Sequence, residues 1–248
     1  MPEPFSWFMF VPEIGADHKL LTIAHTWVVT LLLLAMAWLV RGHLKRKREE
    51  LTEADLIPED RLTLRNLFEI YVEGIHGMMH GLLKEKTPQY FWLIGTLFIY
   101  IMFSNMAGLV PGLLPPTENI NTNAAMAIIV FLVYNYVGIK TQGVGPYFKH
   151  MLGPIIWIAP LMFVVETISH FVRPASLSIR LFGNINGDHY VLAIFSQVIP
   201  SIVSPILGVG VPVIFLGLGL FVSFVQAFVF ALLSVVYIAL AVTEEEHH

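Results

Sequence analysis

The sequence predicts an all-α integral membrane protein, and three observations support this fold class. Of its 248 residues, 56% are hydrophobic and only 13% are charged, whereas soluble domains carry about 25% charged residues. Several uncharged stretches reach the roughly 20 residues that a helix needs to cross about 30 Å of hydrocarbon. Basic residues follow the first of these stretches, as expected at the cytoplasmic end of a transmembrane helix. We expect a single membrane domain over residues 1–248.

The composition argues against several other classes of protein. The chain has 14 Lys+Arg against 18 Asp+Glu and a net charge of −4, so it lacks the basic field that nucleic-acid binding needs. It has no cysteine, which excludes disulfides, thiolate metal sites and cysteine nucleophiles. It also lacks a glycine-rich phosphate-binding loop. We therefore expect no phosphoryl chemistry, no cofactor and no metal site.

The first half of the chain predicts one spanning helix and one interfacial helix. Residues 20–40 are uncharged and long enough to cross the bilayer. The basic cluster that follows places the N-terminus outside and residues 41–63, a polar linker, in the cytoplasm. In residues 64–86, apolar side chains recur at helical spacing opposite charged residues and histidines. This pattern is typical of an amphipathic helix in the plane of the membrane interface.

The second half predicts two ordinary spans and two unusually long ones. Residues 89–110 cross outward and residues 124–139 return, joined by a loop without Lys or Arg, as expected outside the cell. Residues 150–199 and 206–242 form two long, mostly apolar helices. Their more apolar parts, residues 160–199 and 211–242, would be roughly 60 and 48 Å long as continuous helices. Both lengths are far more than the hydrocarbon thickness. We expect both helices to tilt steeply and to pack as a hairpin, giving five passes and a cytoplasmic C-terminus.

Polar residues on the first long helix recur every three or four positions and fall within an arc of roughly 120°. This polar ridge consists of Glu166, Ser169, Arg173, Ser176, Arg180, Asn184 and Asp188. A second set projects onto one sector of the last helix: Gly219, Ser223, Gln226, Ser234 and Tyr237. The two weakly polar faces would meet each other or face a partner.

Arg180 is the most informative residue of the ridge. A guanidinium near the bilayer centre costs about 2.5 to 3.5 kcal/mol at least and does not deprotonate. Such a charge predicts an ion pathway. The alternative is structural: Arg173 and Arg180 pair with Glu166 and Asp188, or extend to the interface.

The segment Ser176-Leu-Ser-Ile-Arg180-Leu-Phe-Gly-Asn184 resembles the signature of subunit a of the F-type ATP synthase, the membrane stator of a rotary motor. Four further features agree with this family. They are the segment 105–112 before the external loop, Glu166 ahead of the arginine, Gln226 in the last helix and Tyr237 after it.

The resemblance implies a function and partners. Arg180 would be the essential stator charge facing a ring of c subunits, whose carboxylates carry protons or Na⁺ between two half-channels. Peripheral-stalk b subunits and the remaining ATP synthase subunits would complete the complex in a bacterial inner membrane, and this chain would be a non-catalytic subunit. Residues implied along the ion pathway are Glu166, Ser169, Ser176, Asn184, Asp188, His189, Gln226 and Tyr237. Relatives usually carry Glu and His where this chain has His189 and Gly219, so an Asp188–His189 arrangement would supply that function.

Three competing interpretations remain. An independent secondary ion transporter also uses broken helices and intramembrane charge, although no inverted repeat is evident. A membrane enzyme would need a nucleophile or a ligand signature that the sequence does not show. Glu73, His76 and His80 have a spacing that suits metal ligands, but they lie on the solvated side of the interfacial helix.

Overall fold

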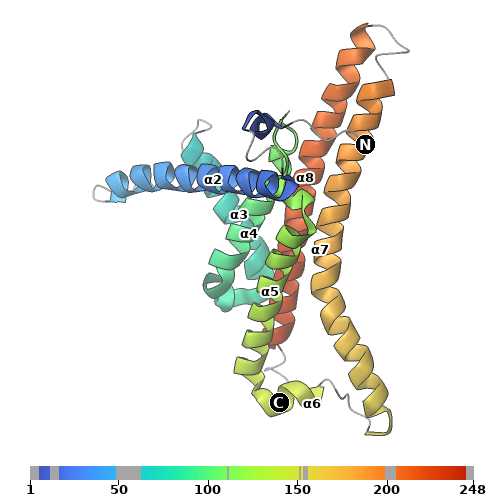
Figure 1. Cartoon of the computed structure of the whole chain (residues 1–248). Coiled ribbons are helices and arrows are strands. Elements are labelled where there is room, and N and C mark those ends of the chain that lie inside the picture. The colour runs from blue at the N-terminus through green and yellow to red at the C-terminus, as the bar shows by residue number, and fades with distance from the viewer. Residues whose placement is uncertain are drawn as a thin grey trace.

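The computed structural model describes residues 6–11, 17–48, 63–110, 112–150, 152, 156–198 and 205–243. Over these residues the chain forms α-helices and short 3-10 helices, without a strand. Figure 1 shows two long helices side by side, a group of shorter helices packed against them, and one helix lying across the group. The all-α architecture predicted from the sequence is confirmed.

The N-terminal helix α2 (His18–Arg48) extends at both ends beyond the span predicted over residues 20–40. Residues 41–48 were expected to begin the cytoplasmic linker, but they continue the helix. The physical reason is local: Lys, Arg and Leu are good helix formers, and no proline interrupts this basic segment. The rest of the predicted linker, residues 49–62, lies outside the described residues.

Helix α3 (Leu64–Leu83) is the predicted amphipathic helix, and the 3-10 turn η3 (Lys84–Lys86) follows it. The Thr63 hydroxyl caps its start by accepting a hydrogen bond from the Asn66 N–H at 3.3 Å. Ile75 and Met79 are buried on one side, whereas His76 is exposed. The buried side packs on α4, where the Tyr71 hydroxyl donates to the Gly95 carbonyl oxygen at 2.5 Å.

Helices α4 (Thr87–Ala107) and α5 (Ile120–Gln142) come next and begin two and four residues earlier than predicted. Helix α4 ends three residues earlier than predicted, and α5 ends three residues later. Asn119 caps α5 by accepting from the Asn121 N–H at 2.9 Å. Gly143, with φ +83°, ends α5 in a conformation that favours glycine. The chain then enters a short helix that the sequence did not predict, α6 (Val144–His150).

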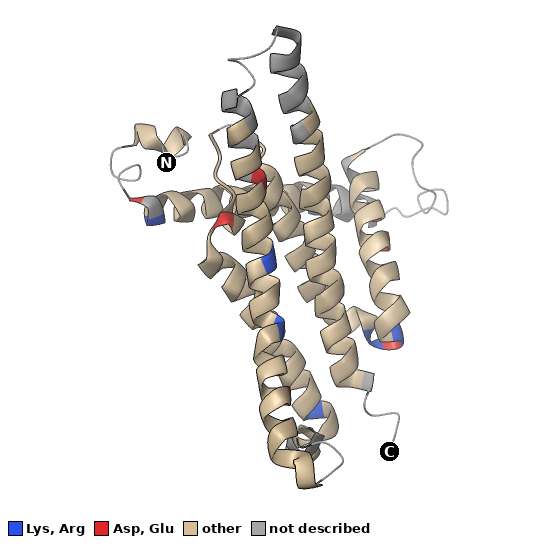
Figure 2. Ribbon diagram, turned by 90° about the vertical axis from the view of Figure 1, so that its right-hand side faces the viewer, with Lys and Arg blue, Asp and Glu red and all other residues tan. Residues whose placement is uncertain are grey.

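The last two helices are long, as predicted. Helix α7 (Ala159–Val198) has 40 residues and α8 (Pro205–Thr243) has 39, so both approach 60 Å in length at about 1.5 Å per residue. Helix α7 begins at Ala159 and not at residue 150, because α6 and the 3-10 turn η5 (Ile156–Ile158) precede it. The two helices run antiparallel side by side in both ribbon views, while α2 crosses them steeply (Figures 1 and 2). Helix α2 and the long pair therefore cannot all follow the membrane normal, and the steep tilt of the pair stays a prediction.

Four helical segments of the described chain are long and apolar enough to cross a membrane: Lys19–Arg41, Asn66–Ala107, Ile120–Gln142 and Leu216–Val242. Helix α7 does not appear among them, although it is one of the longest helices. Its polar ridge lowers its hydropathy, because charged and amide side chains interrupt the apolar run. Five passes therefore stay a prediction.

The hairpin of α7 and α8 is held mainly through α4 and α5. Helix α8 packs most extensively on α4, and α7 packs most extensively on α5, whereas α7 and α8 touch each other less. The rings of Phe98 on α4 and Phe224 on α8 lie 5.9 Å apart, edge to face. Ala227 and Ala231, completely buried on α8, follow Phe224 at helical spacing. Small side chains at this face let the α4 and α8 backbones approach closely.

Candidate functional site

The polar ridge of α7 lies beside the stripe with which this helix packs. Leu177, Leu181 and Ile185 are buried and anchor α7 in the core. Of the ridge side chains, Arg180 is exposed and the other six are half-buried. Charged positions are sparse on the long helices, and those on α7 stand in a mostly uncharged ribbon (Figure 2). A rigid helix therefore presents a line of polar groups at the edge of the packed core.

Glu166 and Arg173 form an ion pair within this ridge. A guanidinium nitrogen of Arg173 lies 3.7 Å from Oε1 of Glu166, and both side chains keep about a third of their surface exposed (30% and 35%). The guanidinium carbon also lies 5.7 Å from the ring centroid of Tyr237 on α8. The internal pairing expected from the sequence thus holds for Arg173, and Tyr237 is adjacent to it. An exposed pair of this kind contributes about 0 to 1 kcal/mol.

Arg180 has different surroundings. It lies with Gln226, Leu181 and Phe230 at a narrow gap between α7 and α8 that leaves no room for a water molecule. Across the described part of the chain, no ion pair or hydrogen bond to its side chain is found. Because hydrocarbon cannot satisfy a guanidinium, the exposed face of Arg180 requires water or a partner. The structure thus brings the predicted Arg180 and Gln226 together.

The remaining predicted residues are distributed along the same two helices. The Ser176 hydroxyl donates to the Arg173 carbonyl oxygen at 2.9 Å, within its own helix. Ser169, Asn184 and Asp188 are half-buried on α7. The side chain of His189 lies outside the described residues. On α8, Gly219, Ser223 and Ser234 are buried, and the Ser234 hydroxyl donates to the Phe230 carbonyl oxygen at 2.7 Å.

A polar cluster that the sequence did not predict joins three helices. Nε2 of His170 on α7 lies 2.7 Å from Oδ1 of Asn135 on α5. The hydroxyl of Tyr147 on α6 donates to the same oxygen at 2.8 Å. The sequence holds only a weak signal for this cluster: an asparagine and a histidine, each within an apolar stretch.

Two of the three α3 residues whose spacing suits metal ligands lie next to each other. His76 and His80 stack with their ring centroids 5.8 Å apart, and both are exposed. Nδ1 of His80 lies 3.1 Å from the Lys84 carbonyl oxygen at the helix end. Among the described residues, no group of three or more His, Asp or Glu side chains is arranged to hold an ion.

Long apolar helices and a line of polar groups along α7 together define an all-helical integral membrane protein. The chain belongs to the ATP synthase A chain family, whose model matches residues 23–239. The signature around Arg180 lies within the matched region.

Individual relatives agree with the family model. The chain is 39% identical over 241 residues to ATP synthase subunit a of Bdellovibrio bacteriovorus, covering 97% of this chain and 99% of that protein. It is 42% identical over 230 residues to ATP synthase subunit a of Geobacter sulfurreducens, covering 93% and 89%. A third relative, ATP synthase subunit a of Geotalea uraniireducens, is 43% identical with the same coverage.

Gly219, where the resemblance led us to expect a larger residue, is held in close contact. A Cβ atom at this position would lie 2.7 Å from Cδ2 of Leu109, next to the end of α4. We expect Gly219→Val to displace the flexible Leu109 side chain and to lower the stability of the purified complex by about 1 kcal/mol, because the added side chain overpacks this contact. Thermal unfolding in detergent measures the effect.

Gly217 provides a matched control, since a Cβ atom there meets nothing within 4 Å. Gly217→Val should cost nothing in packing and should gain slightly from helix propensity, because valine is a better helix former than glycine. Leu109→Ala in the Gly219→Val background should restore much of the loss. Equal destabilisation by both valines would contradict a contact-specific effect.

Proposed function

We propose that this chain is the ion-translocating stator subunit of an F-type ATP synthase. The single observation that carries the proposal is Arg180, an exposed arginine in the middle of a long membrane helix, next to Gln226 and within a family signature. The charge needs water or a partner, and a ring of c subunits with membrane carboxylates would provide a partner. Peripheral-stalk b subunits and the soluble ATPase subunits complete the proposed assembly.

The proposed mechanism is electrostatic. A carboxylate that arrives within about 4 to 6 Å of Arg180 is favoured in its ionised form, so it releases its ion to the exit half-channel. The fixed charge of Arg180 also prevents an ion from passing directly between the two half-channels. Coulomb attraction of about 4 kcal/mol at 4 Å, with an effective dielectric of 20, is strong enough to promote release and weak enough for rotation to continue.

The other ridge residues take supporting roles in this proposal. Gln226 positions Arg180 without neutralising it, since an amide carries no charge. Glu166, Ser169, Ser176 and Tyr237 line the cytoplasmic half-channel, and Asn184, Asp188 and His189 line the outer one. This assignment follows from a bacterial inner-membrane location with the N-terminus outside and the C-terminus in the cytoplasm. The subunit couples ion flow to rotation, while ATP is made by other subunits.

The absence of cysteine from the chain makes a direct test of this proposal simple. A single cysteine at Ile179, 62% exposed beside Arg180, is labelled with a photoreactive maleimide in native membranes. We expect an adduct with the small c subunit, identified by mass spectrometry. A cysteine at Leu132, 60% exposed on α5, serves as the control and should give no c adduct. A stable homo-oligomer that yields no c adduct from Ile179 would instead favour an independent transporter.

A further inference from the structure

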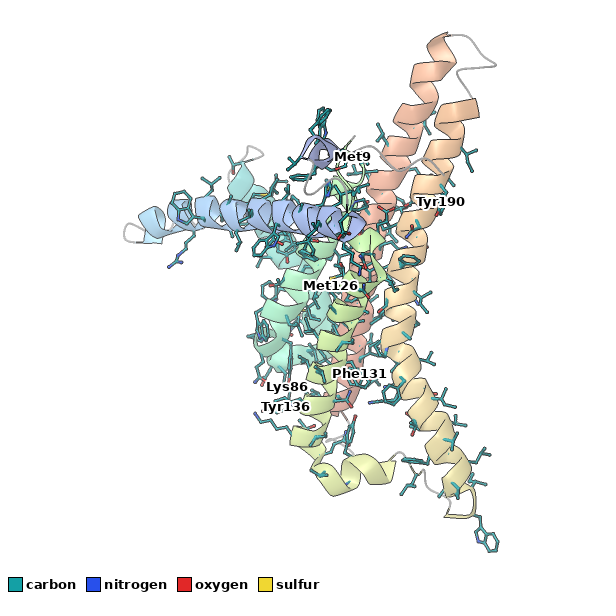
Figure 3. All side chains as sticks on the ribbon, in the orientation of Figure 1. Met9, Lys86, Met126, Phe131, Tyr136 and Tyr190 are labelled. Carbon is teal, nitrogen blue, oxygen red and sulfur yellow. The ribbon has the colours of Figure 1, made fainter. Side chains whose placement is uncertain are left out.

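The strongest feature outside the proposed stator site is the cluster of His170, Asn135 and Tyr147, which joins α7, α5 and α6. The imidazole also lies edge-on to Phe131 and Tyr134, with ring centroids 5.2 Å away in each case. Figure 3 labels Phe131 in the region between α5 and α7. These contacts fix the position and the plane of the His170 ring.

The hydrogen bonds also determine which ring nitrogen carries the proton. The amide nitrogen of Asn135 donates to the Phe131 carbonyl oxygen at 2.6 Å, so Oδ1 is the atom that faces His170 and Tyr147. Oδ1 can only accept, and therefore Nε2 of His170 must donate its hydrogen. In neutral His170, Nδ1 is then the proton acceptor. Within the described residues, no hydrogen-bond partner of Nδ1 is found.

His170 lies on α7 between the members of the Glu166–Arg173 ion pair. Glu166 precedes it by four residues and Arg173 follows by three, so both are its neighbours on the helix surface. Titratable groups that face the cluster from the other helices are Tyr134 on α5, Tyr147 on α6 and, beside Arg173, Tyr237 on α8. Glu166 is the one acidic group among these described neighbours.

We propose that His170 is a proton-relay residue of the cytoplasmic half-channel, exchanging protons between the Glu166 carboxyl group and cytoplasmic water. The Nδ1 lone pair takes the proton from Glu166, which becomes a carboxylate and is stabilised by Arg173. The same nitrogen then gives this proton to water, while the Nε2–H continues to donate its hydrogen bond to Oδ1 of Asn135. The inference rests on the proposed function and names the proton as the transported ion.

The test uses the assembled complex in membrane vesicles, with ATP-driven pumping and passive conduction through the membrane sector measured between about pH 5 and 8, where imidazole titrates. His170→Gln keeps an N–H donor for Asn135 but cannot titrate. We expect it to assemble, to conduct about tenfold less and to lose the pH dependence of the wild type near neutrality. A wild-type rate and pH profile in this variant would overturn the proposal, as would pumping that requires Na⁺.

Asn135→Asp provides a second test, which measures the midpoint of the pH profile and does not require the His170→Gln variant to fold. A carboxylate at Oδ1 favours the protonated imidazole, so the midpoint of the pH profile should move upward by about one to two pH units. The same substitution in the His170→Gln background should leave the profile unchanged. A midpoint that does not move in the single variant would overturn the relay. Arg180→Ala separates the two claims: if that variant still pumps, the proposed stator function fails, whatever His170 does.

Discussion

Arg180→Ala is expected to abolish ATP-driven ion pumping while the complex still assembles. Arg180 is exposed and makes no ion pair or hydrogen bond with the described residues, so its removal should leave the packing of α7 intact. The lost attraction to an arriving carboxylate, about 4 kcal/mol at 4 Å, corresponds to about three powers of ten in rate. Fluorescence quenching of a pH-sensitive dye in inverted vesicles measures the loss.

The neighbouring Ile179→Ala is the control for this prediction. Ile179 is 62% exposed on α7, but it carries no charge. It should retain most of the pumping activity. The amount of c and ATPase subunits that co-purify must match in both variants. Normal pumping by an assembled Arg180→Ala complex would refute the role proposed for the arginine.

Ala231→Leu is expected to have the second largest effect, through packing and not through ion handling. Ala231 is completely buried on α8, on the face where Phe224 meets Phe98 of α4. Additional methylene groups in such a close contact force the helices apart, which costs about 1 to 3 kcal/mol or more. We expect a lower melting temperature in detergent and less of this subunit in the membrane.

Ala125→Leu is the matched control, because Ala125 is exposed on α5. The same change in side-chain size should have little effect there, since the added atoms meet lipid and not another helix. Wild-type stability of Ala231→Leu would show that the α4–α8 contact is looser than the buried alanines indicate. Loss of pumping without loss of stability would point to a role in the ion pathway.

The sequence predicted the elements of the fold because they depend on local patterns. Apolar runs gave α2, α4 and α5, the helical spacing of residues 64–86 gave α3, and excess length gave α7 and α8. Element ends were less accurate. Helix α2 continues through residues 41–48 because basic residues at the membrane boundary also favour a helix. The short helix α6 carries no hydrophobic period long enough to recognise.

The sequence also singled out Arg180, Gln226 and the Glu166–Arg173 neighbours, because a charge inside an apolar stretch is a signal in itself. It could not reveal His170 as part of a site. Its partners Asn135 and Tyr147 are 35 and 23 residues away, on helices whose relative rotation no local pattern fixes. Isolated polar residues in an apolar helix look alike until packing brings them within hydrogen-bond distance.

The sequence by itself therefore determined that this is an all-helical membrane protein of the ATP synthase A chain family with a polar ridge on its longest helix. Only the tertiary structure decided that α8 packs chiefly on α4 and α7 on α5, that Arg180 and Gln226 share one gap, and that Asn135 orients His170. The physical reason is that hydropathy and helical period act between neighbours in the chain, whereas helix pairing depends on the shape of side chains far apart in sequence.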